Sequence, residues 1–233
     1  MISGCLLGGF ISKATAGNIY GTGAGVGPGG RDTNWSVVAV PTGWTPPSGQ
    51  TTPYSAYVYN AVAYNWVGSG GWGAPTQVGY TNADGTFYWE GIQPSADAIY
   101  GFPTDYNYIL AQTFTVDQAG YYNFLFPASG DNTFSFYING TVVQDTMKPT
   151  ISGGTQIGTS QNNFWNIYTV SGGAMLHQGV NTAYALINEQ GFSSGVLIGQ
   201  SSFSFAGVPE PSTYALMGLG GLALVIAYRR RVA

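Results

Sequence analysis

Residues 133–144, TFSFYINGTVVQ, decide the fold class of this 233-residue chain. The side chains of Phe134, Phe136 and Ile138 fall on one face, because every second residue of a strand points the same way. The residues between them, Ser135 and Tyr137, fall on the opposite face. A period of two with one apolar face predicts a strand that packs that face on a core.

Asn139-Gly140 follows this strand and predicts a tight turn, since Asn-Gly is a favoured dipeptide of two-residue β-hairpins. The sequence TVVQ at 141–144 then predicts a short second strand. We therefore expect 133–139 and 141–144 to pair with each other as a hairpin.

Strand-like runs recur along the chain, with Gly, Pro, Asn and Asp between them. They lie at 35–40, 54–59, 61–67, 109–116, 121–126, 164–170, 182–188, 196–199 and 202–205. Many short strands separated by turn residues predict an all-β fold, an antiparallel sandwich or a barrel. Within it we expect Trp35, Trp89 and Trp165 to be core residues, because each stands in strand-like sequence.

Residues 31–207 are long enough for one such domain with its own core. The segment before it, 17–30, contains the glycine-rich stretch GTGAGVGPGG and predicts a flexible leader.

Residues 1–16 have features of an export signal. A short apolar stretch, GCLLGGFI at 4–11, precedes Ala14-Thr15-Ala16, which has the small-x-small pattern of a signal-peptidase site with cleavage after Ala16. The positively charged opening region is missing, and Lys13 follows the apolar stretch. We interpret 1–16 as the end of a signal peptide that begins upstream, or as an atypical signal.

The C-terminal segment, 208–233, has three parts in a fixed order. Pro209-Glu210-Pro211, in which the prolines exclude helix, precedes an apolar run at 214–228, and Arg229, Arg230 and Arg231 follow. As a helix the run would be about 22 Å long, whereas a bilayer core is about 30 Å thick. The arginines are expected to stay in the cytoplasm. The segment is therefore either a short C-terminal anchor or a sorting signal that is removed.

This ordered combination resembles the PEP-CTERM proteins of Gram-negative, exopolysaccharide-forming bacteria. The resemblance implies that an integral-membrane exosortase recognises the tail, with Pro209, Glu210 and Pro211 as the sorting motif. It also implies that a C-terminal hydrophobic helix lies transiently in the inner membrane. The expected destination is the cell envelope, the outer surface or the extracellular matrix.

A second resemblance lies within 31–207. In order along the chain, its motifs are DTNW at 32–35, YILAQTFT at 108–115, GDN at 130–132 before FSFYINGT, GVNT at 179–182 before AYALIN, and SGVL at 194–197. They are similar to the galactose-binding-like jelly roll found in many PEP-CTERM proteins. The resemblance implies a two-sheet antiparallel β-sandwich, shared with carbohydrate-binding modules and ancillary domains of glycosidases. A shared fold does not by itself give a function.

Charge is sparse in the exported part. Between 17 and 208 the basic residues are Arg31 and Lys148, against nine acidic residues, which gives a net charge of about −7. Two cations cannot build the basic face that a nucleic-acid partner needs. The one cysteine, Cys5, lies in the expected signal peptide, which excludes disulfides and thiol chemistry from the exported part.

A sugar site combines a flat aromatic ring with amide, hydroxyl and carboxylate groups. The chain has six tryptophans and seventeen tyrosines. Trp44, Trp66 and Trp72 lie in or beside glycine- and proline-rich loops, where a ring is more often exposed than in a strand. We take these three as candidate contacts to an extracellular polysaccharide, with burial in the core as the alternative for each.

The enzyme and metal motifs fail on their context. GFSSG at 191–195 matches G-x-S-x-G, but the only histidine, His177, precedes the serine instead of following it, and one histidine cannot form a zinc site. The G-x-G-x-x-G at 25–30 is interrupted by Pro28. Asp131-Asn132 could offer oxygen ligands to calcium, although a turn is the simpler interpretation. We expect no catalytic residue, no cofactor and no metal.

The sequence thus predicts an exported, non-enzymatic β-sandwich protein of the cell surface or exopolysaccharide matrix, with signal peptidase and an exosortase as processing partners and glycan binding as its role. A purely structural matrix or adhesion role and a glycan-active hydrolase stay open as alternatives.

Overall fold

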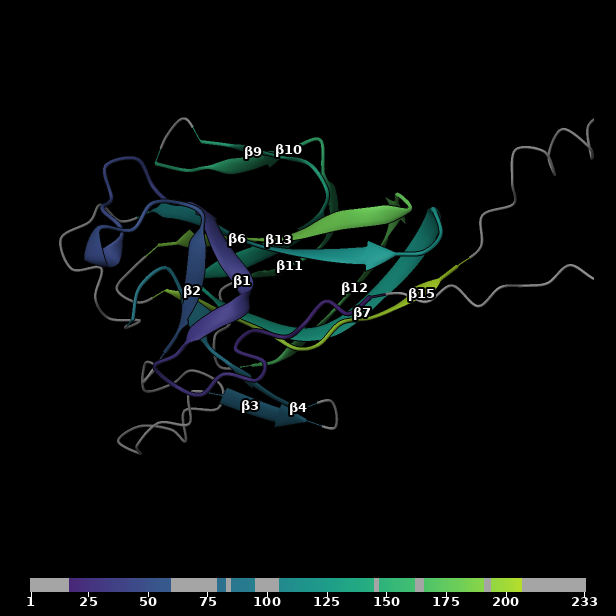
Figure 1. Ribbon diagram of the computed structural model, residues 1–233, viewed down its shortest axis with the longest axis horizontal. Helices are drawn as coiled ribbons and strands as arrows, with labels where there is room; N and C mark the ends of the chain where they lie inside the picture. The colour runs from purple at the N-terminus through teal and green to yellow at the C-terminus, as the bar shows by residue number, and fades with distance from the viewer. Residues whose placement is uncertain are drawn as a thin grey trace, which may run out of the picture.

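The computed structural model describes residues 17–59, 79–82, 85–94, 105–144, 147–161, 166–190 and 194–206. Within these ranges the chain is almost entirely strand, with one short 3-10 helix, η1 (Pro47–Gly49), and no α-helix (Figure 1). The predicted all-β class is confirmed. The strand expected at 61–67 and the C-terminal helix lie outside the described residues.

The large sheet is antiparallel and contains eleven strands. In pairing order they are β11 (Thr155–Gln161), β8 (Thr133–Ile138), β13 (Gly179–Glu189), β6 (Tyr106–Val116), β1 (Arg31–Ala39), β2 (Tyr54–Val58), β5 (Glu90–Gly91), β14 (Gly195–Ile198), β7 (Gly120–Asp131) and β12 (Tyr168–Leu176), while β15 (Ser202–Phe205) also pairs with β7. Two small sheets pair β3 (Gly79–Asn82) with β4 (Gly85–Tyr88), and β9 (Thr141–Val143) with β10 (Thr150–Ser152).

The large sheet curls until its end strands, β11 and β12, lie side by side, which produces a two-layered sandwich. In Figure 1, β7, β12 and β15 form the layer below β6 and β13. Gly158 on β11 and Gly172 on β12 allow this close approach. A Cβ on Gly172 would overlap the carbonyl oxygen of Ile157, and one on Gly158 would lie 2.7 Å from Cγ1 of Val170. Larger residues at either position would hold the two end strands apart.

Aromatic rings fill the space between the layers. Phe134, Phe136 and Ile138 are each at most 1% exposed, which confirms the inward face predicted for this strand. The ring centroid of Phe136 lies 4.6 Å from that of Phe126 on β7 and 6.4 Å from that of Trp35 on β1. Phe136 therefore joins the two layers.

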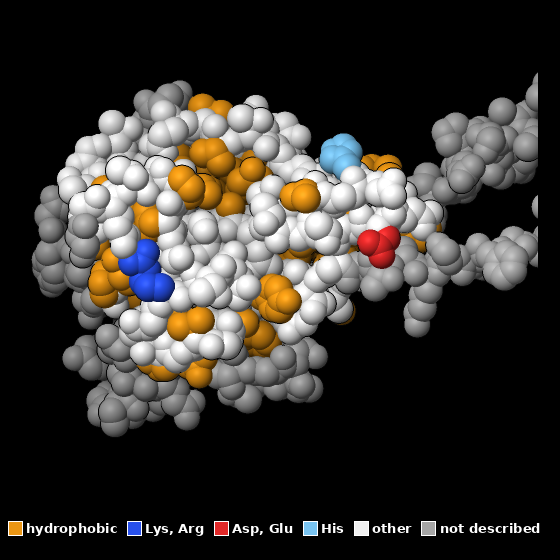
Figure 2. All heavy atoms as spheres, in the orientation of Figure 1, with side chains coloured by type: hydrophobic (Ala, Val, Ile, Leu, Met, Phe, Trp, Pro, Cys, Tyr) orange, Lys and Arg blue, Asp and Glu red, His pale blue; other side chains and the backbone are white. Residues whose placement is uncertain are grey.

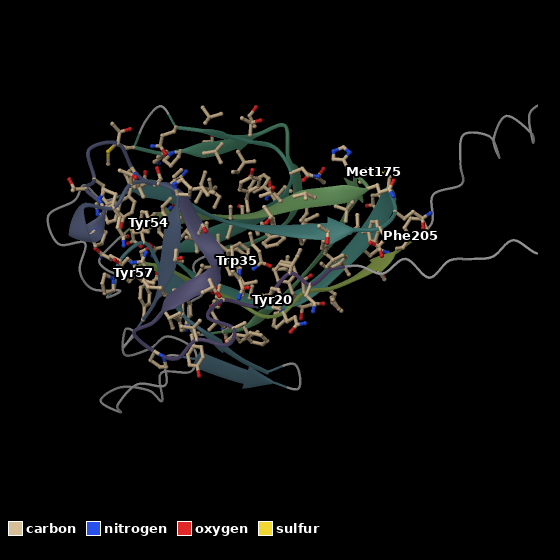
Figure 3. All side chains as sticks on the ribbon, viewed as in Figure 1. Tyr20, Trp35, Tyr54, Tyr57, Met175 and Phe205 are labelled. Carbon is tan, nitrogen blue, oxygen red and sulfur yellow. The ribbon has the colours of Figure 1, made fainter. Side chains whose placement is uncertain are left out.

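Two of the three tryptophans expected in the core are there. Trp35 and Trp89 are completely buried, and Figure 3 shows Trp35 in the interior beneath β1. The indole N–H of Trp35 donates to the carbonyl oxygen of Tyr20 at 2.9 Å, so its polar atom is satisfied inside the core. Trp165 lies outside the described residues.

The hairpin predicted for 133–144 is wrong. β9 pairs with β10, whereas β8 lies between β11 and β13. Asn139 has a positive φ of 56°, as a turn residue can, but its backbone N–H donates to the carbonyl oxygen of Thr182 at 2.7 Å, and its Oδ1 accepts from the N–H of Thr182 at 3.0 Å. Because Asn139 is bound to β13, the chain leaves the large sheet at this turn.

The glycine-rich segment 17–30 packs on the sandwich and does not hang free, contrary to the expected flexible leader. Ile19 is completely buried and bridges to Ser201. The N–H of Thr22 donates to the carbonyl oxygen of Ile198 at 2.8 Å, and its hydroxyl accepts from the N–H of Ile198 at 3.0 Å. These contacts attach the segment to the sandwich, so the folded domain includes 17–30.

Candidate functional site

One of the three predicted sugar-contact residues falls in the described part of the chain. Trp44 lies half-buried in the loop after β1 and packs against the core, and its N–H donates to the Pro41 carbonyl oxygen at 3.1 Å. The other predicted site residues lie outside the described ranges: Trp66, Trp72, Ala16, Pro209, Glu210, Pro211, Arg229, Arg230 and Arg231. Their roles stay predictions.

An open groove of about 560 Å³ crosses the outer face of β15, β7 and β12. None of its ten lining residues is charged. The exposed side chains that line it are Tyr121, Asn123, Leu125, Ser171, Ser202 and Ser204. The groove therefore combines apolar surface with amide and hydroxyl groups, the mixture found in sites for neutral polar ligands.

Strand pairing arranges these side chains in rows. Leu125 on β7 stands opposite Ser202 on β15 and Ser171 on β12. Asn123 stands opposite Ser204 on β15 and a glycine on β12. Neighbouring strands lie about 4.8 Å apart, so hydroxyl groups flank the apolar centre of the groove on both sides.

Tyr121 lies across the neighbouring strand at one end of the groove. A Cβ built on Gly173 of β12 would come within 2.5 Å of Cε1 and Cζ of the Tyr121 ring. The ring thus occupies the space that any other residue at 173 would fill. Since Tyr121 is also 37% exposed, it offers part of an aromatic ring, held close to the sheet, to solvent.

Stacked aromatic residues form the floor of the groove. The rings of Phe124 and Phe203 are stacked, with centroids 5.5 Å apart and an interplanar angle of 25°. Phe203 also meets Phe114 edge-on at 5.3 Å. Because these rings pack into the core, they hold β15 against β7 and keep the groove walls in place.

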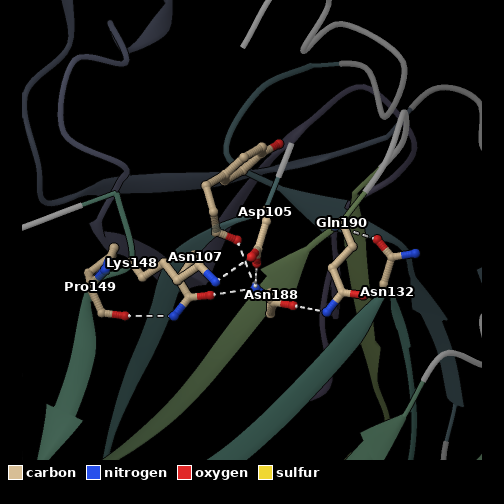
Figure 4. A network of polar contacts seen from close by, with 8 residues as sticks. Asp105, Asn107, Asn132, Lys148, Pro149, Asn188 and Gln190 are labelled. Atoms are coloured by element: carbon tan, nitrogen blue, oxygen red, sulfur yellow. Dashed lines mark hydrogen bonds and ion pairs between the residues drawn. The ribbon is translucent and has the colours of Figure 1, made fainter. Parts of the chain in front are cut away.

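The opposite end of the sandwich carries a network of polar side chains centred on Asn188 (Figure 4). Its amide nitrogen donates to Asp105 Oδ1 at 3.0 Å, to the Tyr106 carbonyl oxygen at 3.3 Å and to Asn107 Oδ1 at 2.9 Å. Its Oδ1 accepts from Gln190 Nε2 at 2.7 Å. These groups largely satisfy one another, so the network ties β6 and β13 together at this end.

An ion pair completes the network. Lys148 Nζ lies 2.5 Å from Asp105 Oδ2, and both side chains are about half exposed. The hydrogen bond from Lys148, followed by that from Asn188, lowers the pKa of Asp105. Exposed pairs of this kind contribute little to stability, on the order of 0.5 kcal/mol.

Asp131-Asn132, weighed above as calcium ligands, join the same end. The N–H of Asn132 donates to the Asn188 carbonyl oxygen at 3.1 Å, and its Oδ1 accepts from the N–H of Gln190 at 2.6 Å. Asp131 is 4% exposed. In the described ranges, no group of three or more His, Cys, Asp or Glu residues is arranged to hold a metal ion.

Asp32 on β1 and Glu90 on β5 form a completely buried pair of carboxyl groups. Asp32 accepts hydrogen bonds from the N–H groups of Gly23 and Asn34, each at 2.6 Å, and of Trp35 at 3.2 Å. Burial, followed by the adjoining Asp32 carboxyl, raises the pKa of Glu90 well above its usual range, while the Gly23 N–H opposes the rise. Of the two carboxyl groups, Glu90 is therefore the one that is driven toward its protonated form, and Asp32, through the N–H of Gly23, fastens the segment 17–30 to the sandwich.

The groove was not among the sequence predictions, although the sequence carried a signal for it. In an alternating strand with one solvent-facing side, outward positions are usually polar. β7 instead places Tyr121 and Leu125 outward, with Asn123 between them. What the sequence could not show was that serines and a glycine from β12 and β15 stand beside them.

Residues 207–231 match the family model of the PEP-CTERM protein-sorting motif. The chain therefore carries a PEP-CTERM sorting motif, which implies export and sorting by an exosortase. Within the described residues, no helix is long and apolar enough to cross a membrane.

A comparison with curated proteins gave no match. Among solved structures, the chain is similar to a ruminal GH26 endo-beta-1,4-mannanase, with 15% sequence identity and a TM-score of 0.28. The similarity covers 69% of this chain and 27% of that protein, so the chain spans about a quarter of its length.

Proposed function

We propose that this exported, exosortase-sorted protein works without enzymatic activity at the surface or in the exopolysaccharide matrix of a Gram-negative bacterium, where its β-sandwich binds a neutral polysaccharide along the groove. The observation that carries the proposal is the uncharged groove itself, with Tyr121 and Leu125 beside an amide and serine hydroxyls.

The chemistry of the groove suits a sugar ring. The C–H face of a pyranose is apolar and packs on Tyr121 and Leu125, while its hydroxyl groups bond to Asn123, Ser171 and Ser204. Serine and asparagine side chains both donate and accept hydrogen bonds, as sugar hydroxyls do. A groove that is open to solvent along the sheet surface can accept a stretch of a long polymer.

The surface favours a neutral partner over a charged one. Figure 2 shows a face that is mostly uncharged, with hydrophobic side chains in small separate patches. Between 17 and 208 only Arg31 and Lys148 are basic. Arg31 is already engaged: its guanidinium donates to the Ser55 carbonyl oxygen at 2.7 Å and stacks on Tyr57, with 3.9 Å from Cζ to the ring centroid.

Binding is favoured over hydrolysis because a glycosidase needs two carboxyl groups facing the sugar from opposite sides. The groove offers no carboxyl group among its lining residues. At the opposite end of the sandwich, Asp131 and Glu189 are at most 4% exposed, and the half-exposed Asp105 is paired with Lys148.

The test is isothermal titration of the full chain with the purified exopolysaccharide of the host. We expect Tyr121→Ala combined with Leu125→Ser to reduce the affinity by about tenfold or more, which corresponds to a loss of about 1.4 kcal/mol. Tyr184→Ala, which removes an outward tyrosine from β13 in the opposite layer, is the matched control and should bind as the wild type does. Affinity should change little with salt, because no ion pair holds the ligand.

Equal affinity of the wild type and the double variant would remove the groove from the site. A Trp66→Ala, Trp72→Ala variant would then test the loop tryptophans predicted from the sequence. If none of these proteins binds the polysaccharide, the structural matrix or adhesion role replaces the proposal, and release of reducing sugar would support the hydrolase alternative.

A further inference from the structure

Both ends of the described chain are fastened to the same turn. The N–H of Gly17 donates to the carbonyl oxygen of Thr115 at 2.8 Å, and the N–H of Ala206 donates to that of Tyr121 at 2.9 Å. Thr115 and Tyr121 lie on either side of the turn that joins β6 to β7. The chain therefore enters and leaves the sandwich at one end.

A second turn adjoins the first. Leu176, the last residue of β12, pairs with Gly120, and Gly179, the first residue of β13, pairs with Val116. We call these two turns, 116–120 and 176–179, together with the residues next to them, the exit end of the sandwich. The polar network around Asn188 occupies the opposite end, where β6 begins and β13 finishes.

Exposed apolar side chains gather at the exit end. Of the six large apolar side chains exposed in the described residues, four stand beside its two turns: Tyr121 (37%), Met175 (55%), Val180 (67%) and Phe205 (37%). Met175 stands opposite Tyr121 on the neighbouring strand, and Phe205 packs edge-on against Tyr122 at 5.3 Å. Figure 3 shows Met175 and Phe205 at the same end of the molecule, away from Tyr54 and Tyr57. Exposed apolar surface of this kind marks a contact site.

The short length of chain between Ala206 and the apolar run indicates that this surface lies near the membrane. The sorting motif begins at residue 207, and the apolar run begins at 214. Even fully extended, residues 207–213 span at most about 25 Å. While the apolar run is in a bilayer, the exit end must therefore stay close to the headgroups. The predicted signal peptide ends at Ala16, directly before Gly17, and so places its membrane segment at the same end.

We propose that the exit end docks on the surface of the lipid bilayer while the precursor is still attached to the membrane, with Met175, Val180 and Phe205 in the interface between headgroups and acyl chains. The partner is the lipid surface itself, through apolar contact. The two turns carry Asp117 and His177 and no Lys or Arg, so docking does not rely on Lys or Arg and needs no anionic lipid. The proposal rests on the sorting motif and not on polysaccharide binding.

The contact has a consequence for the groove. Tyr121 belongs both to the exit end and to the groove. Docking thus covers one end of the groove in the precursor, and release of the domain from the membrane uncovers it.

The experiment uses the full chain, with Cys5→Ser, reconstituted in phosphatidylcholine vesicles that contain a spin-labelled lipid as quencher. A fluorophore is placed on Gln178→Cys in the exit-end turn, or on Thr169→Cys, an exposed position six residues before Met175 on the same strand. We expect quenching of the label at 178 to be at least threefold stronger than at 169, and unchanged by salt.

A triple variant, Met175→Ser, Val180→Ser and Phe205→Ser, tests whether the apolar side chains make the contact. Its label at 178 should lose most of the additional quenching, although the tail still carries the protein into the vesicles during flotation. Leu125→Ser, an exposed apolar residue of the groove, is the control and should keep it.

Equal quenching at 178 and 169 in the wild type would overturn the proposal. So would a triple variant that is quenched like the wild type, or quenching that requires anionic lipid. None of these results depends on whether the groove binds a polysaccharide.

Discussion

The ring of Tyr121 lies over Gly173 of the neighbouring strand, in the space that a side chain at 173 would fill. The glycine is thereby part of the groove, since it decides how close to the sheet the ring can lie. Because residue 173 has no side chain, the Tyr121 ring can lie close to the surface of the sheet.

Gly173→Ala should lift the Tyr121 ring away from the sheet and weaken polysaccharide binding by about tenfold, about 1.4 kcal/mol. Titration with the host exopolysaccharide measures it. Gly27→Ala is the matched control, because a Cβ at Gly27 meets nothing within 4 Å. Full affinity in the Gly173→Ala protein would mean that the position of the ring does not matter.

Phe136→Ala should lower the free energy of unfolding by about 3–5 kcal/mol, because it leaves a cavity between the two layers. Tyr137→Ala, the next residue along β8 and on its outer face, should cost less than about 1.5 kcal/mol. Urea denaturation of both variants measures the difference. Similar losses for the two would contradict the register of β8. Because Cys5 is the only cysteine, reducing agent should leave the unfolding midpoint of every variant unchanged.

Glu90→Gln should flatten the dependence of stability on pH. The pKa of Glu90 is raised in the folded protein, so the folded state holds a proton that the unfolded chain releases near pH 4.3, about the ordinary value for glutamate. The contribution of this proton to the free energy of unfolding is fully present below about pH 4. It decreases as the pH rises above that value, by up to about 1.4 kcal/mol per pH unit.

Urea denaturation between about pH 5 and about pH 9 compares the two proteins. The wild type should lose more stability than Glu90→Gln over this range, and Asp117→Asn, on an exposed turn, should behave as the wild type does. Parallel curves for the wild type and Glu90→Gln would show that Glu90 is ionised in the folded protein.

If the tail is removed during sorting, the mature protein is shorter than the precursor. Intact mass of protein from the native host should show a chain without the apolar run and without Arg229, Arg230 and Arg231. Glu210→Ala should leave the precursor in the membrane, whereas Ser212→Ala should be processed. A mature chain that still ends at Ala233 would favour the plain membrane anchor.

The sequence was sufficient for the faces of the strands but not for their partners. Alternation placed Phe134, Phe136 and Ile138 inward, because facing is a property of one strand alone. Strand pairing, in contrast, depends on distant parts of the chain. β8 pairs with β11 and β13, whereas the local Asn-Gly signal predicted pairing with β9. Two hydrogen bonds between Asn139 and Thr182, which are 43 residues apart, join the end of β8 to β13.

The candidate groove was not predicted from the sequence, for the same reason. Aromatic residues in loops were the evident candidates, and Trp44 proved to pack against the core. The groove needs Leu125 and Ser202 to lie opposite each other, 77 residues apart in the chain. No short window of sequence contains that neighbourhood. The attachment of 17–30 was likewise hidden, because it depends on Ile19 reaching Ser201.

The contact between the end strands β11 and β12 affects how copies of the protein could associate with one another. An exposed strand edge is a template on which another molecule can add its own strand. Here the two terminal strands of the sheet cover each other through Gly158 and Gly172, so neither is open to a neighbour. Molecules crowded together at a cell surface would not assemble through these edges into stacked sheets.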